Sequence, residues 1–142
     1  MYVTPNKRSI YFIIFVVSLI LIFFVEGIFI KDSNHNVDSA KNGCLDFLEE
    51  KGIEVDVSSC EIKNIKIPEK FNDVYSKYND LQRKSGYDLS DYCGKTVEKY
   101  TYKVINHNGD DTVFVNLLVL ADKIIGGDIT NDVINGFIKP LK

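Results

Sequence analysis

The segments TVEKYTYKVI (residues 96–105), NHNGDD (106–111) and TVFVNLLVLA (112–121) decide the fold of this chain. In the first, Tyr100 and Tyr102 alternate with threonine and lysine, which is typical of a strand. In the second, an Asn-Gly pair supplies the left-handed conformations that a tight hairpin turn needs. The third is apolar almost throughout, which predicts a central strand covered on both faces.

The sequence after this hairpin predicts one more strand and a short helix. A tight turn at Asp122-Lys123 leads into the apolar pair Ile124-Ile125. We expect Gly126-Gly127-Asp128 to break that strand, because glycine weakens a strand interior. Thr130–Gly136 then suits a short terminal helix.

The sequence before the hairpin alternates between helical and strand spacing of apolar residues. The elements expected there are a helix at Val37–Lys51, strands at Ile53–Val57 and Glu61–Ile67, a helix from Pro68 to Gly86 and a loop at Tyr87–Lys95. A bulge near Asn64 would explain the irregular spacing of the second strand. The order of elements predicts an α+β domain in which both main helices pack on one face of an antiparallel sheet.

A long apolar run near the start of the chain raises the hydrophobic fraction of all 142 residues to 45%. Of the 21 residues of Ile10–Ile30, 18 are hydrophobic, the exceptions being Ser18, Glu26 and Gly27. A helix of roughly 20 such residues spans a bilayer. Because Lys7 and Arg8 precede the run, the positive-inside rule predicts a cytoplasmic N-terminus and an extracytoplasmic C-terminal domain.

This segment predicts a single-pass signal-anchor protein of the cell membrane. We expect a cytoplasmic tail at residues 1–9, a transmembrane anchor at 10–30, a linker at 31–36 and an α+β domain at 37–142. Cleavage as a signal peptide, which would give a secreted protein, and burial as a core helix are the alternatives. A cleaved chain would begin near Ile28.

Several spaced motifs resemble a bacterial family known as domain of unknown function 4830, over about Ile67–Leu141. The motifs that carry the resemblance are Ile67–Phe71, Val74-Tyr75, Tyr78-Asn79, Leu81-Gln82, Gly86–Leu89, Tyr92, Gly94-Lys95, Ile125–Asp128 and Gly136-Phe137. The resemblance implies a small exported or membrane-anchored protein. It implies no activity, because that family has none established.

The tripeptide Gly126-Gly127-Asp128 is compatible with two local structures. Successive glycine N–H groups can converge on an anion as a nest, or the glycines can allow a bulge or a structural turn with positive φ, with Asp128 or Thr130 capping the next turn. The nucleotide-cyclase signature Gly-Gly-Asp-Glu-Phe does not apply, because Ile129 and Thr130 follow Asp128.

Three cysteines, Cys44, Cys60 and Cys93, lie outside the apolar run. A disulfide between Cys44 and Cys60 closes the shortest loop, and three unpaired thiols are the alternative. Cys93 with His107 would be the pair for a small extracytoplasmic hydrolase or thiol enzyme, if the loop folded over the hairpin.

The remaining chemistry is sparse. No ligand spacing suggests a metal site, and no motif suggests a cofactor. Lys31–Lys142 carries 19 acidic and 15 basic side chains without a dense basic stripe, which disfavours nucleic acid. Tyr100 and Tyr102 form a ladder that either lies in the core or offers an interaction surface. We therefore expect a non-catalytic binding module with a protein or peptide partner outside the membrane.

Overall fold

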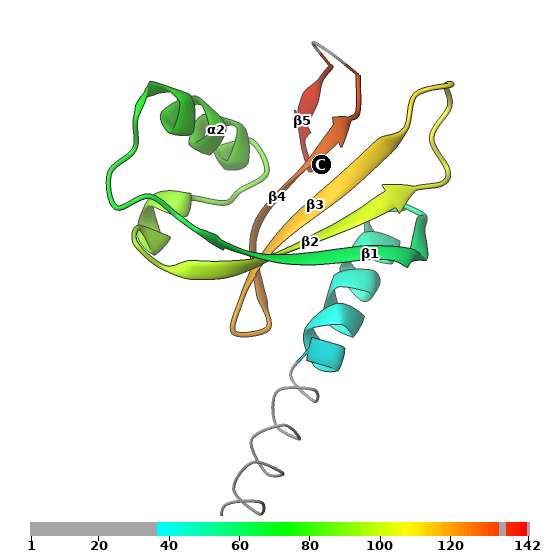
Figure 1. The fold of residues 1–142 in the computed structure, drawn as a ribbon, viewed down its shortest axis with the longest axis horizontal. Coiled ribbons are helices and arrows are strands. Elements are labelled where there is room, and N and C mark those ends of the chain that lie inside the picture. Colours follow the sequence, from blue (N-terminus) through cyan, green and yellow to red (C-terminus); the bar gives the residue numbers. More distant parts are fainter. Residues whose placement is uncertain (1–36, 134–135, 142) are drawn as a thin grey trace, which may run out of the picture. The chain divides into compact units, whose positions relative to one another are not determined.

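A computed structural model describes residues 37–133 and 136–141 of the chain, and Ser39–Lys142 forms one unit. Its centre is a five-stranded antiparallel sheet in the order β1-β2-β3-β4-β5 (Figure 1). The strands are β1 (Val55–Lys66), β2 (Thr96–Val104), β3 (Val113–Leu120), β4 (Lys123–Asn131) and β5 (Ile138–Pro140). Residues 37–50 are helical, and α2 (Asp73–Arg83) and the 3₁₀ helix η1 (Leu89–Tyr92) follow β1. The expected α+β class is confirmed.

The two helices cover opposite faces of the sheet. Tyr100 pairs with Leu117 and Thr101 with Asn116, so successive residues of β2 and β3 point to alternate faces. Tyr100 and Leu117 pack with Cys44 and Leu48 of the helix at residues 37–50. A second cluster on the other face joins Leu118, Val97 and Leu89 to the α2 region. The expectation of both helices on one face is therefore wrong.

The apolar run of the third segment explains this arrangement. Along β3, Val115 and Leu117 are buried in one cluster and Leu118 in the other. A strand sandwiched between two layers loses the alternation of polar and apolar residues. The expectation of a central strand covered on both faces is confirmed, and it requires a helix on each side.

Four expected features of the strands and the last helix differ from the structure. The two strands expected at Ile53–Val57 and Glu61–Ile67 are one strand, β1, whose register with β2 shifts between Asp56 and Glu61 rather than near Asn64. Within this bulge, the N–H and hydroxyl of Ser58 donate to the Asp56 carboxylate, and the Ser59 hydroxyl donates to the Asp56 carbonyl. β4 continues to Asn131, so the expected break at Gly126–Asp128 and the helix expected from Thr130 are wrong.

The predicted anchor at Ile10–Ile30 lies outside the described residues. Within residues 37–133 and 136–141, no helix is long and apolar enough to cross a bilayer.

Candidate functional site

The tyrosine ladder lies in the core and forms no surface. Tyr100 and Tyr102 are both fully buried between the sheet and the helix at residues 37–50. The Tyr100 hydroxyl donates to Glu98 at 2.9 Å. Burial raises the pKa of Tyr100, and burial together with nearby Cys60 raises the pKa of Tyr102. Of the two alternatives for these residues, the position in the core is the correct one, and the interaction surface is wrong.

Gly126-Gly127-Asp128 lies inside β4, directly after a shift in register with β3 between Ile124 and Gly126, so it is neither an anion nest nor a turn, and the bulge lies just before it. Gly126 and Gly127 pair with Leu118 and Leu117, and neither has a positive φ. The Gly127 N–H donates to Oε1 of Gln82 at 2.8 Å. The missing side chain of Gly126 lets Gln82 of α2 and Leu89 approach β4, and the missing side chain of Gly127 leaves room for Leu141 and the backbone of β3.

All three cysteines are free thiols in the structure. Cys44 is buried, and Cys60 is half-buried against the same core cluster. Burial, followed by the neighbouring Cys60, raises the pKa of Cys44 to about 12. Formation of a disulfide between these two residues stays a prediction.

Cys93 and His107 do not come together. Cys93 is exposed after η1, just before β2 begins, and His107 lies in the turn after β2 ends. The nine residues of β2 span about 25 Å. The structure therefore provides no dyad of these two side chains.

A row of polar side chains crosses three strands on the face that α2 partly covers. Thr101, Asn116 and Asp128 are direct neighbours in the registers of β2, β3 and β4. Thr101 Oγ1 donates to Asn116 Oδ1 at 2.8 Å, and Asn116 Nδ2 donates to Asp128 Oδ1 at 2.8 Å and to Thr130 Oγ1 at 3.3 Å. The Tyr78 hydroxyl donates to Asp128 Oδ2 at 2.6 Å. We call these five residues the polar row.

The polar row forms part of the floor of an open groove of about 580 Å³ beside α2. Tyr75 of α2 and Phe114 of β3 contribute aromatic walls, and Ile138 of β5 contributes an exposed apolar one. Lys63 of β1 and Lys99 of β2 contribute the basic part of the lining. The groove combines hydrogen-bonding groups, apolar surface and charge, which is the usual make-up of a ligand site.

The groove lining carries two acidic side chains, Glu61 and Asp128, and two basic ones, Lys63 and Lys99. Asp128 is buried, and its carboxylate is held by the Asn116 amide and the Tyr78 hydroxyl. Burial, followed by the negative charge of Asp128, raises the pKa of Tyr78 and keeps its proton on the oxygen. Lys63 and Lys99 stand directly opposite each other in the register, and Lys63 also forms an exposed ion pair with Glu61 of the lining at 3.0 Å.

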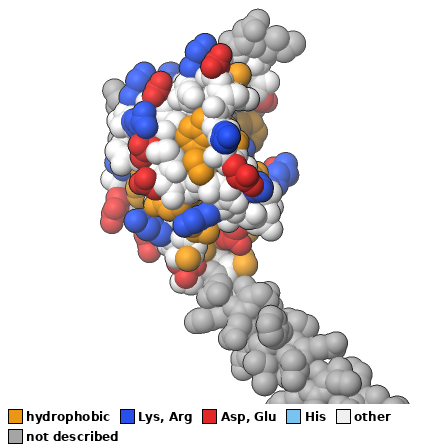
Figure 2. Space-filling model, turned by 90° about the vertical axis from the view of Figure 1, so that its left-hand side faces the viewer, with side chains coloured by type: hydrophobic (Ala, Val, Ile, Leu, Met, Phe, Trp, Pro, Cys, Tyr) orange, Lys and Arg blue, Asp and Glu red, His pale blue; other side chains and the backbone are white. Residues whose placement is uncertain are grey.

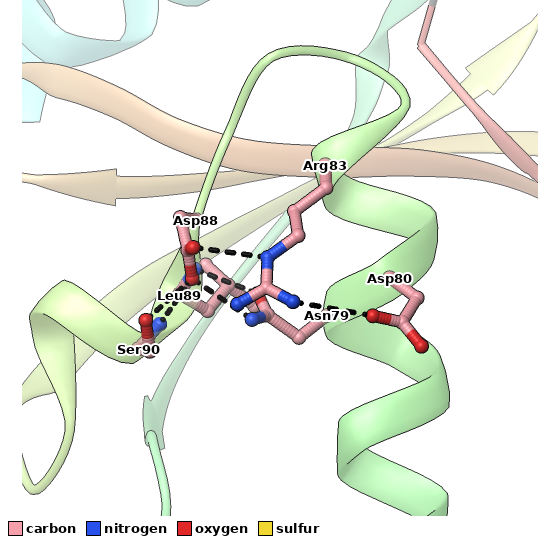
Figure 3. Close-up of polar contacts among 6 residues, drawn as sticks. All are labelled: Asn79, Asp80, Arg83, Asp88, Leu89 and Ser90. Atoms are coloured by element: carbon pink, nitrogen blue, oxygen red, sulfur yellow. Dashed lines mark hydrogen bonds and ion pairs between the residues drawn. The ribbon is translucent and has the colours of Figure 1, made fainter.

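A hydrogen-bond cluster fixes α2 beside the groove (Figure 3). Asn79 Oδ1 accepts from the buried Leu89 N–H at 2.7 Å, and Asn79 Nδ2 donates to Asp88 at 2.8 Å. Asp88 also accepts from Arg83 at 2.9 Å and from Ser90. These bonds lower the pKa of Asp88, the largest contribution coming from Ser90. The cluster ties α2, which carries the groove residues Tyr75 and Tyr78, to η1.

The sequence contained one unused signal for this site. Asn116 is the one polar residue inside the apolar run of β3. A buried amide in a central strand needs partners, and those partners are the other residues of the polar row. In the described part of the chain, no group of three or more His, Cys, Asp or Glu side chains could hold a metal ion.

Comparison with known proteins gives one match. The model of the family described as "Domain of unknown function (DUF4830)" matches residues 47–129, which includes α2, η1 and the strands β1 to β3, with most of β4. No curated protein and no solved structure matches the chain significantly. Motifs that carry the sequence resemblance are joined in space, because Tyr78 bonds to Asp128, Asn79 to Leu89 and Gln82 to Gly127.

Proposed function

The chain belongs to the family described as Domain of unknown function (DUF4830), and from that premise we propose that it is a membrane-anchored, extracytoplasmic, non-catalytic binding module. The groove beside α2 is the binding site. The observation that carries this proposal is the polar row on the floor of the groove, where satisfied side chains hold hydroxyl groups in fixed positions. Such preorganisation lowers the entropy cost of binding.

An extended acidic peptide fits the groups that the groove offers. Thr101 uses its proton on Asn116 and keeps lone pairs free to accept, whereas Thr130 accepts from Asn116 and keeps its proton free to donate. A peptide backbone carries one donor and one acceptor per residue, which matches this pair. Because Lys63 already pairs with Glu61 at 3.0 Å, a peptide carboxylate would pair with Lys99.

Binding without catalysis agrees with the residues that line the groove. Among the described residues around it there is no cysteine, histidine or serine. Its buried carboxylate, Asp128, has a hydrogen-bond donor on each oxygen and is held as a structural acceptor. Nucleic acid is not the proposed partner, because positive and negative side chains are interspersed on the face seen in Figure 2.

Anchoring by Ile10–Ile30 places the groove outside the cell membrane in this proposal. We expect the full-length mass to remain with membranes after a carbonate wash. We also expect a protease added to intact cells to cut the domain at residues 37–142. A soluble product beginning near Ile28 would contradict the anchor and favour a secreted protein.

Peptide selection on the full-length chain in lipid nanodiscs tests the groove. We expect a random peptide library to yield acidic sequences, because Lys63 and Lys99 line the site. The substitution Lys99→Glu should weaken the selected peptides by roughly tenfold or more, since it replaces an attraction by a repulsion. Fluorescence anisotropy of one labelled peptide measures the change in Kd.

Lys77→Glu is the matched control for this experiment. Lys77 is an exposed residue of α2 outside the groove lining, so the same change of charge there should leave the Kd within about twofold. A selection without acidic bias, or equal binding by the Lys99→Glu variant, would contradict the proposed site.

A further inference from the structure

The two edges of the sheet differ in their capacity to pair with another strand. β5 has three residues and includes Pro140, which has no N–H to donate, so this edge is closed to extensive pairing. β1 has twelve residues, contains no proline and, among the strands of the described residues, pairs only with β2. The bulge near Asp56 limits its regular part to Glu61–Lys66. This segment is the free edge of the sheet (Figure 1).

The hydrogen bonds between the residue after β1 and the chain before β2 show which backbone groups of β1 point away from β2. The Ile67 N–H donates to Lys95 and the Ile67 carbonyl accepts from Gly94, so Ile67 faces β2. Neighbouring residues of an antiparallel strand point alternately to one side and the other. Ile62 and Asn64 therefore direct their N–H and C=O groups outward, away from β2.

The side chains of the free edge favour antiparallel pairing with an identical strand in one register. When Ile62 lies opposite Ile62, each Glu61 faces a Lys63 and two exposed isoleucines meet. Centring the pair on Lys63 would oppose two lysines. Centring it on Asn64 would set Lys63 against Ile65. Ile62 is 40% exposed and Glu61 and Lys63 are both exposed, so all three side chains are accessible.

We infer that a second copy of this chain pairs along β1, with the two-fold axis at Ile62, so that Glu61–Lys63 of the two copies lie side by side and the two sheets meet edge to edge. Each Ile62 exchanges both backbone hydrogen bonds with its counterpart, and the two Glu61–Lys63 pairs lie at the closely spaced positions beside it. Charges on an edge strand usually repel an incoming strand. Here they alternate in sign about a central apolar residue and so attract an identical one.

Charge reversal of the full-length chain in detergent micelles tests this pairing, with the protein mass followed by sedimentation equilibrium. We expect the wild-type chain to be a dimer. Glu61→Lys and Lys63→Glu should each weaken the dimer by roughly 10–100-fold, because each turns two attractive contacts into two repulsive ones. The double variant Glu61→Lys/Lys63→Glu should restore it, since the opposite charges face each other again.

Two controls keep this result specific. Lys77→Glu makes the same change of charge on α2 and should leave the dimer intact. Circular dichroism of the single variants should match the wild type, because the Lys63–Glu61 ion pair within one chain is exposed and contributes little to stability. A monomeric wild-type chain, which would leave the edge to a strand of another protein, would overturn the inference. So would single variants that dimerise like the wild type.

Discussion

Raising the pH above about 10 is expected to unfold the domain cooperatively, with the free energy of unfolding falling by about 5 kcal/mol per pH unit. The four groups responsible are Tyr78, Tyr100, Tyr102 and Cys44, whose pKa values are all raised in the folded state, first of all by burial. On unfolding in this range each releases one proton, and each proton contributes about 1.4 kcal/mol per pH unit.

The direction of this effect follows from the raised pKa values. The stabilising contribution of each group is complete below its unfolded pKa, which is 9.0 for the cysteine and 10.0 for the tyrosines. It is lost as the pH rises from there through the folded pKa, which is about 12 for Cys44. Because small domains are stable by about 5–15 kcal/mol, unfolding should be complete within roughly three pH units.

Tyrosinate absorbance and far-ultraviolet circular dichroism, followed together, measure this transition. Absorbance of the buried tyrosines should rise only when the secondary structure is lost. Tyr78→Phe removes one titrating group and should lower the slope by about a quarter. Titration of all the tyrosines near their ordinary pKa, with unchanged circular dichroism, would show that the tyrosines are not buried as described.

The burial of Tyr100 and Tyr102 could be predicted only in part from the sequence. Alternation along β2 places both on one face and Lys99 and Lys103 on the other, and this local signal is correct. Which face of β2 is buried depends on the helix at residues 37–50. The sequence of the apolar side of this helix does not indicate which strand it contacts. The lysines were nevertheless informative, because the face opposite two lysines is the better candidate for the core.

The positions of the helices and of the polar row depend on contacts between distant residues. The apolar run of β3 required cover on both faces, and the expectation of both helices on one face overlooked this requirement. Asn116 indicated a buried polar site, but its partners Thr101, Asp128 and Tyr78 come from three other elements. Local patterns predicted β2, β3 and the hairpin between them, whereas the extent of β1 and β4 and the assembly of the site required the tertiary fold.

The role of the glycine pair of β4 could not be predicted from the sequence either. Two glycines allow a turn as readily as they allow another chain segment to pack closely against the strand. The deciding contact is Gln82, which lies 45 residues before Gly127 and bonds to its N–H. A side chain at Gly127 would also meet the backbone of β3. The tripeptide thus serves the packing of α2 and the sheet, and substitutions there measure how tight that packing is.

The substitution Gly127→Ala is expected to destabilise the domain by about 3 kcal/mol or more. A Cβ at this position would lie 2.5 Å from the carbonyl oxygen of Asn116 and would also overlap Leu141. The carbonyl belongs to the central strand and cannot move without disturbing its ladder with β2 and β4. Urea unfolding at constant m-value measures the loss.

Alanine substitutions at two further glycines are expected to rank below Gly127→Ala in the stability that they cost. Gly126→Ala should cost less, because its Cβ meets the end of the Gln82 side chain at 2.9 Å, and a side chain yields more readily than backbone. Gly43→Ala should instead stabilise by about 0.5–1 kcal/mol, since the site is helical with no atom within 4 Å. A larger loss of stability for Gly126→Ala than for Gly127→Ala would contradict this ranking. It would show that the contact of Gln82 with β4 tolerates an added side chain less well than the spacing between β3 and β4 does.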